Sequence, residues 1–143
     1  MAEDITALIL KNILATLESV TSINAVGLGT FLQTEKPRPH AGVIPGDDSG
    51  IHAAPGVREC TFAIRVRLVA DEQDEAAVFK LIEARKDAHA ALIADRSRGG
   101  YAEDTRYLMT RWLFVDPHEP QAGGDMHWEI DYKTKHTDLT AQP

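Results

Sequence analysis

Histidine and carboxylate side chains are the usual metal ligands and proton-transfer groups in proteins, and this chain has six histidines. No two of them have the spacing of a helical His-Glu-x-x-His zinc site. His127 and Glu129 match the His-x-Glu half of a zinc deaminase motif, but the paired cysteines that complete that metal site are absent. The polar face of a strand explains both residues, and the sequence predicts no metal site there.

A nucleophile or cofactor site is equally hard to assemble from these residues. Cys60 is the only cysteine, which excludes an internal disulfide and any multi-cysteine zinc or iron-sulfur site. Gly27 and Gly29 lack the third glycine of a dinucleotide fingerprint. His89 lies near the inward edge of a helical pattern, where a partly buried structural histidine is favoured over a catalytic base. We therefore expect no catalytic residue and no cofactor.

Charged side chains gather in two places. Asp47 and Asp48 could offer oxygen ligands to a hard cation, although the spacing of a calcium loop is missing. A basic cluster surrounds the Gly99-Gly100 turn and consists of Arg96, Arg98, Arg106 and Arg111. Such a cluster could contact a phosphate or pair with acidic residues of a neighbouring subunit. The net charge of −7 argues against a surface that grips nucleic acid, but it suits a conduit through which DNA slides.

Two helices are predicted from apolar residues spaced three and four apart. The first begins near Asp4 and carries one apolar stripe, formed by Ile5, Leu8, Ile9, Ile13, Leu17 and Val20. The second has about five turns and ends before Gly99. Acidic residues from Asp71 to Glu75 stand where the helix dipole favours negative charge. Its inward face is expected to include Val78, Leu81, Ile82 and Leu92.

Five strands are predicted around these helices. The clearest begins at Val57, where an apolar face alternates with a polar one and consists of Cys60, Phe62, Ile64, Val66 and Leu68. Weaker strands cover residues 26–32 and 40–44, and two more cover residues 107–115 and 126–133. The stretch from Pro45 to Gly56 reads as a long exposed loop, and so does Asp116 to Asp125.

Together these elements predict an α+β fold in the order αβββαββ. Two amphipathic helices are expected to pack on one face of a mostly antiparallel sheet. A mixed sheet remains an alternative. The length suits a single domain over residues 1–135, with a flexible C-terminal tail over residues 136–143. No apolar run is long enough to span a membrane, and the chain does not start like a signal peptide.

The layout from Asp4 to Thr134 resembles the tail terminator proteins of long-tailed bacteriophages. The resemblance is architectural, because that family has no diagnostic short motif. It covers the amino-terminal helix, the Pro/Gly-rich segment and the strand CTFAIRVRLVA, and then the helix DEQDEAAVFKLIEARKDAHAALIAD and the turn RSRGGY. The closing pair of strands, TRYLMTRWLFVD and MHWEIDYKT, completes it.

The resemblance implies a structural virion protein that is not an enzyme. Proteins of that family form a hexameric ring on the end of the tail tube, stop its polymerisation and present a surface for head joining. The implied partners are further copies of the chain, the tail tube protein and the head connector or neck protein. DNA would pass through the bore without specific binding, and no membrane is involved. The protein would be assembled in the bacterial host cytoplasm and would reside in the virion tail.

Under that interpretation the functional residues are assembly contacts. The candidates are Asp47, Asp48, Ile51, His52, Arg96, Arg98, Arg111, His118 and Glu119. The nearest alternative is another phage neck or tail-tube component. A small enzyme and a host-interaction module are further alternatives.

Overall fold

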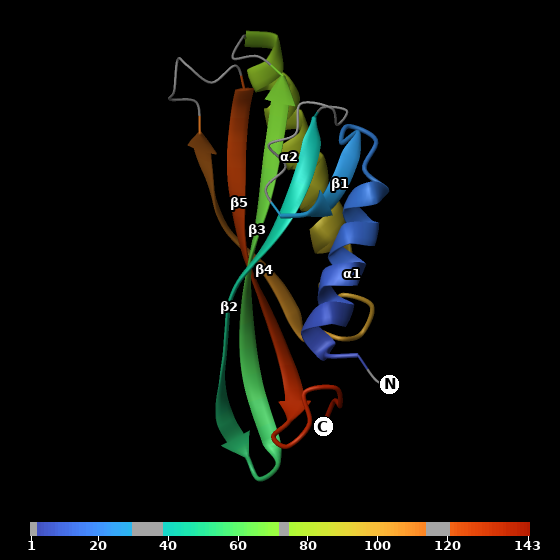
Figure 1. Cartoon of the computed structure of the whole chain (residues 1–143), viewed down its shortest axis with the longest axis vertical. Helices are drawn as coiled ribbons and strands as arrows, with labels where there is room; N and C mark the ends of the chain where they lie inside the picture. The colour runs from blue at the N-terminus through green and yellow to red at the C-terminus, as the bar shows by residue number, and fades with distance from the viewer. Residues whose placement is uncertain (1–2, 30–38, 72–74, 114–120) are drawn as a thin grey trace.

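The computed structural model describes residues 3–29, 39–71, 75–113 and 121–143. Its elements follow the predicted αβββαββ order: α1 (Ile5–Glu18), β1 (Ala25–Leu28), β2 (His40–Ala54), β3 (Val57–Asp71), α2 (Glu75–Ala94), β4 (Asp104–Leu113) and β5 (Gln121–Lys135). The strands form one sheet in the order β1-β2-β3-β5-β4 (Figure 1). β1 is parallel to β2 and every other pair is antiparallel, so the sheet is mixed.

Helix α1 begins and packs as its sequence predicts. Asp4 is the N-cap, and its carboxylate accepts a hydrogen bond from the backbone N–H of Thr6 at 2.8 Å. One face of the helix is buried and consists of Ile5, Ile9, Ile13 and Leu17. This spacing of four residues keeps the stripe on one side, where burial of apolar surface stabilises the packed helix.

The core lies between the two helices and one face of the sheet. The alternation predicted for β3 is confirmed, because Cys60, Phe62, Ile64, Val66 and Leu68 are all buried. The inward face of α2 differs from the prediction. Ile82 is 38% exposed, and the buried positions are Ala77, Leu81, Ala84, Ala88 and Leu92. Three of these five are alanines, which lets the helix backbone approach the sheet closely.

The prediction of a long exposed loop from Pro45 to Gly56 is wrong. β2 runs on to Ala54 and pairs with β3, with register shifts between Pro45 and Asp48 and between His52 and Ala54. Gly46, Asp47 and Ala53 have no ladder partner at these shifts, and the turn lies at Pro55 and Gly56, where Gly56 takes a φ of 77°. The segment looked like a loop because its side chains are exposed from Gly46 onward, so no apolar face marks it as a strand.

β5 also begins earlier than the sequence suggests. Gln121 to Asp125 belong to the strand, where a protruding loop was predicted from Asp116 to Asp125, and the first part of that segment lies outside the described residues. With β2 and β3, the end of β5 forms a strongly twisted ribbon. In Figure 1 this ribbon extends beyond the end of α1 at the bottom of the view.

The last eight residues fold back against the rest of the chain, where the sequence predicted a frayed tail. The N–H of His136 donates to the Gly56 carbonyl at 2.8 Å, and the N–H of Lys135 donates to the Ala141 carbonyl at 2.9 Å. The Leu139 carbonyl accepts from the N–H of Ile5 at 3.1 Å. The segment therefore links the hairpin to the start of α1. Within the described ranges, no helix has the length and apolar character needed to cross a membrane.

Candidate assembly surfaces

The basic cluster around the Gly99-Gly100 turn separates into different roles in the structure. Arg98 is fully buried, so its assignment to an assembly interface is wrong. It adopts a φ of 50°, and its guanidinium donates to the carbonyls of Leu92 and Asp95 at the end of α2. Removal from water lowers the pKa of Arg98. The side chain completes the C-terminus of the helix, where terminal carbonyls need donors.

Two other arginines of the cluster are paired within the chain. Arg96 binds Asp104 with two hydrogen bonds of 2.6 and 3.0 Å, which lowers the pKa of that carboxyl. Arg106 donates to both Asp131 and Glu129 on β5. These intrachain carboxylates take the place of the phosphate or neighbouring subunit considered from the sequence. Arg111 is exposed on β4.

The face of the sheet opposite the helices carries a ladder of ion pairs. Asp125 is only 3% exposed and receives two hydrogen bonds from Arg67, at 2.7 and 2.9 Å, with Arg65 at 3.7 Å. Further along the ladder, Lys133 lies 3.0 Å from Glu103 and 3.7 Å from Glu59. The sequence analysis missed these pairs because their members lie far apart in the chain and meet only through the strand register.

The candidate residues of β2 lie in the ribbon. Asp48 accepts a hydrogen bond of 2.6 Å from the hydroxyl of Tyr132, which is buried. Burial, together with the neighbouring Asp48 carboxylate, raises the pKa of Tyr132. Ile51 is 68% exposed. The ring of His52 lies 3.7 Å from that of His136, centroid to centroid. The structure therefore brings Asp47, Asp48, Ile51 and His52 together on one strand. His118 and Glu119 lie outside the described residues.

The residues with catalytic potential are held by packing contacts. The ring of His89 lies 5.1 Å from that of Tyr107 and 5.7 Å from that of Trp128, so it joins a partly buried aromatic cluster. Cys60 is a buried residue of β3. No group of three His, Cys, Asp or Glu side chains in the described part of the chain is placed to hold a metal ion.

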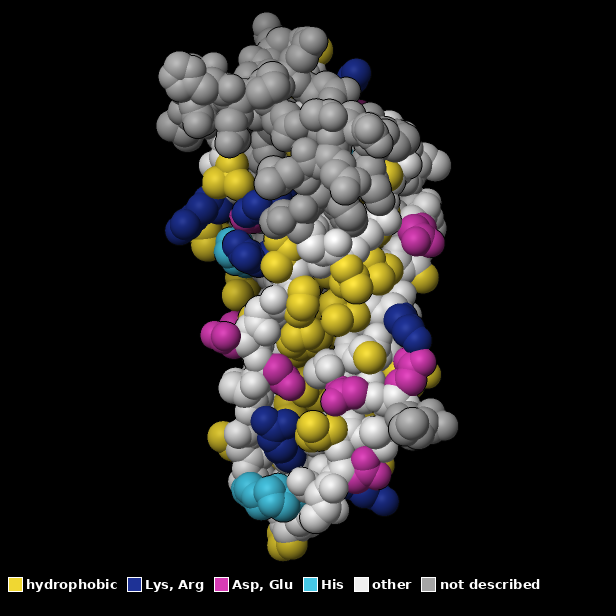
Figure 2. All heavy atoms as spheres, in the orientation of Figure 1, with side chains coloured by type: hydrophobic (Ala, Val, Ile, Leu, Met, Phe, Trp, Pro, Cys, Tyr) yellow, Lys and Arg dark blue, Asp and Glu magenta, His cyan; other side chains and the backbone are white. Residues whose placement is uncertain are grey.

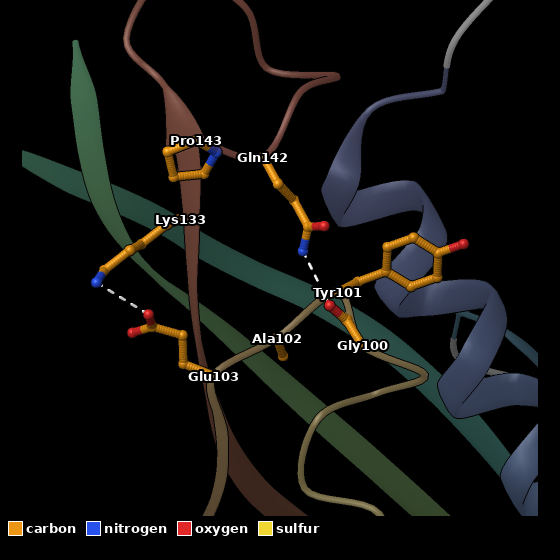
Figure 3. Close-up of a pocket in the computed structure, with 7 residues that line it drawn as sticks. All are labelled: Gly100, Tyr101, Ala102, Glu103, Lys133, Gln142 and Pro143. Carbon is orange, nitrogen blue, oxygen red and sulfur yellow. Dashed lines mark hydrogen bonds and ion pairs between the residues drawn. The ribbon is translucent and has the colours of Figure 1, made fainter.

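Two surface pockets are open to solvent. The pocket in Figure 3 has a volume of about 430 Å³ and lies between the β4 entry and the C-terminal residues. Its charged side chains, Lys133 and Glu103, pair with each other, and the amide of Gln142 donates to the Gly100 carbonyl at 2.9 Å. A pocket of about 280 Å³ is lined by Arg85, Lys86, His89 and Tyr107. Neither pocket presents a nucleophile beside a general base.

Exposed apolar side chains mark the surface more clearly than the pockets do. In Figure 2, hydrophobic side chains gather along the middle of the visible face, between α1 and the sheet, with acidic side chains on either side. Elsewhere, large apolar side chains are exposed on the distal part of β2, on the outer side of α2 and on β4: Ile51, Phe79, Ile82, Leu108, Met109 and Leu113. Single exposed apolar side chains are common on protein surfaces, so the group of three on β4 is the candidate contact surface.

These features define an α+β domain in which two helices cover one face of a five-stranded mixed sheet and the other face is charged. The chain matches no protein-family model and no curated protein. Among solved structures it is similar to a chain of the virion of a native gene transfer agent particle, with a TM-score of 0.53 and 12% sequence identity. The alignment covers 91% of this chain and 95% of that chain. At this level of identity the likeness shows a shared fold.

Proposed function

We propose that this chain is a structural protein of a phage-like virion. The observation that carries the proposal is the fold similarity to a virion chain, which covers nearly the full length of both proteins. The architectural resemblance to tail terminators points to the same class of protein. A fold hosts many functions, so the surfaces of this chain must supply the rest of the argument.

Those surfaces favour assembly over catalysis. The charged groups of the open sheet face and the Gly100 pocket are engaged in pairs with one another. Three large apolar side chains, Leu108, Met109 and Leu113, are exposed together on β4, which suits a contact surface. The twisted ribbon of β2, β3 and β5 projects past the end of α1, where it could reach a neighbouring molecule (Figure 1). A non-enzymatic role as a building block fits these features.

Within the virion, we assign the chain to the end of the tail tube. There it would form a ring, a hexamer by the tail terminator resemblance, that stops tube growth and offers a surface to the head connector. Ring closure limits an assembly that would otherwise continue, provided each protomer has two different complementary surfaces. Repeating a net charge of −7 around the ring would discourage DNA from sticking to the bore.

Gold-labelled antibody against this chain, applied to particles and viewed by electron microscopy, tests the proposal. Label at the junction of tail and head is the expected result. Label along the whole tail would support the alternative of a tail-tube subunit, and label confined to the head would contradict a position at the end of the tail. Particles that carry no label, although the protein is present in the producing cells, would refute the structural virion role.

A further inference from the structure

β4 is the last strand on one side of the sheet, and its outer edge has no partner strand among the described residues. Leu108, Met109 and Leu113 are 50%, 47% and 38% exposed along it. The register shift between Tyr107 and Met109 places Leu108 in a bulge. Proteins usually protect an open edge with charge or a bulge. Here the bulge itself holds an exposed leucine, so this edge is suited to a contact.

On the helix side of the sheet α2 flanks the same strand, whereas Met109, Arg111 and Leu113 pair with open-face positions of β5. The guanidinium of Arg85 lies 5.1 Å from the centre of the Trp112 ring, which joins the helix to β4. Ile82 precedes Arg85 by nearly one turn and is 38% exposed. Lys86 follows, with 72% of its side chain exposed. The β4 edge is therefore an apolar strip with a basic border, to which the exposed Arg111 of β4 also contributes.

A second open edge lies on the opposite side of the sheet. β1 pairs only with the first residues of β2, His40 to Val43. Beyond them, in the described ranges, the outer edge of β2 has no partner strand as far as Ala54. This distal half of β2 carries Asp47 and Asp48, no lysine or arginine, and Ile51 with 68% exposure. It is an extended segment with two carboxylates and one prominent apolar side chain, and the Arg58 side chain of β3 lies against its Gly50.

We infer that the β4 edge of one copy binds the distal half of β2 of a second copy. Each edge has unpaired backbone N–H and C=O groups, and those of one edge can bond to those of the other, as in strand addition to a sheet. Ile51 covers the apolar strip at Leu108 and Met109, and the exposed Asp47 carboxylate faces the basic border. Charge complementarity selects this pairing, since two β4 edges would bring their arginines together.

Because donor and acceptor are different surfaces of the same chain, the contact is head to tail and repeats around a ring. The inference rests on the proposed function in taking self-assembly as the role of the protein. The inference adds which two surfaces of the chain meet. It can be wrong even if the chain is a structural virion protein.

Two variants test the contact by sedimentation of the purified chain. Ile51→Asp places a carboxylate on the donor strand, and Met109→Asp places one on the acceptor strand. Both side chains are exposed, so each monomer should keep its melting temperature. Leu139→Asp is the matched control, because Leu139 is 47% exposed like Met109 but lies on the C-terminal segment, on neither edge.

The expected result is a discrete oligomer for the wild type and the control, and monomers for Ile51→Asp and Met109→Asp. An equimolar mixture of the two variants should form a 1:1 dimer and nothing larger, because one intact donor meets one intact acceptor. Either variant with the wild-type mass, or a mixture that stays monomeric, would overturn the inference. Variants that remain dimers would indicate edges that pair with themselves, which also overturns it.

If the wild type is monomeric in solution, the same contact is tested on particles with the double variant Ile51→Cys, Met109→Cys. Mild oxidation should give a ladder of cross-linked chains, whereas the two single variants should give none. Absence of the ladder in the double variant would overturn the inference. The native Cys60 is buried and does not compete. The proposed function is judged separately, by the presence of the wild-type chain on the particle.

Discussion

Ile64 and Arg65 are neighbours on β3 that point to opposite faces of the sheet. Ile64 is 2% exposed in the core, whereas the Arg65 side chain is 42% exposed and lies 3.7 Å from Asp125. Replacing Ile64 with alanine should lower the free energy of unfolding by about 2–5 kcal/mol, since it leaves a cavity. Arg65→Ala should cost less than about 1 kcal/mol. Urea unfolding measures both, and equal losses would contradict the observed register.

Asp95 gives the turn after α2 a dependence on pH. Its carboxylate accepts hydrogen bonds from the hydroxyl and N–H of Ser97 and from the N–H of Gly99. The Ser97 hydroxyl is the largest cause of a pKa below the ordinary 3.8 of an aspartate. A lowered pKa in the folded state means that the stabilisation is present above pH 3.8 and is lost as the pH falls through the folded value.

We therefore expect Asp95→Asn to flatten the fall in stability on acidification. The change in unfolding free energy below pH 3.8 should be smaller in the variant than in the wild type. Ser97→Ala should have part of the same effect, because it removes the strongest of these hydrogen bonds. Denaturant unfolding at a series of acidic pH values measures this. Identical pH profiles for the wild type and Asp95→Asn would contradict the assignment.

At the scale of elements, the hydroxyl of Tyr132 ties distal β2 to the core. It donates to Asp48 at 2.6 Å, at the point where the register of β2 shifts. Tyr132→Phe should cost about 1–3 kcal/mol, because the hydrogen bond has a charged acceptor. It should also speed amide hydrogen exchange in residues 48–54 more than elsewhere. Tyr101→Phe is the control for loss of a hydroxyl. Unchanged exchange in distal β2 would show that the tie is unimportant.

The elements that the sequence predicted are those whose signal is local. α1 and β3 each bury a continuous stripe of side chains, so their periodicity is visible in the sequence. Distal β2 buries almost nothing and is a strand because β3 supplies its hydrogen-bond partners, which no local pattern reveals. Its Pro45-Gly46 start and Gly50 favour a loop by composition.

The candidate surface was predictable only in part, for a similar reason. Ile51 stands out in sequence as an apolar residue in a polar segment. The burial of Arg98 depends on the turn that follows α2, and the pairs of Arg106 depend on β5 lying beside β4. Leu108 and Met109 are ordinary strand residues until β4 is known to be an edge. Sequence therefore found the acidic side of the inferred contact and missed its apolar acceptor.

At the scale of the whole molecule, the end of the ribbon extends the protein and adds little to its buried core. Residues 52–56 are exposed, and the turn bonds to the C-terminal segment through the Gly56 carbonyl and the N–H of His136. Ile51 and Glu59 are cross-strand partners, so a two-residue Asn-Gly turn could join them directly. Replacing residues 52–58 with that turn shortens the ribbon and keeps Ile51.

The shortened protein should melt within a few degrees of the wild type, since it loses five exposed residues and the half-buried Val57 and Arg58, which pair with the end of β5. In cells that produce particles, however, the proposed function predicts tails that are overlong or lack heads, because a terminator that cannot reach its partners cannot stop tube growth. A matched variant with Ala53→Ser and Ala54→Ser keeps the ribbon length and should give normal tails. Electron microscopy of the particles measures tail length and head joining. Normal, head-joined tails made with the shortened protein would show that the ribbon end has no role in assembly. They would also weaken the proposal that the chain is a tail terminator. A large loss of melting temperature would instead mean that the contact between the turn and the C-terminal segment stabilises the fold.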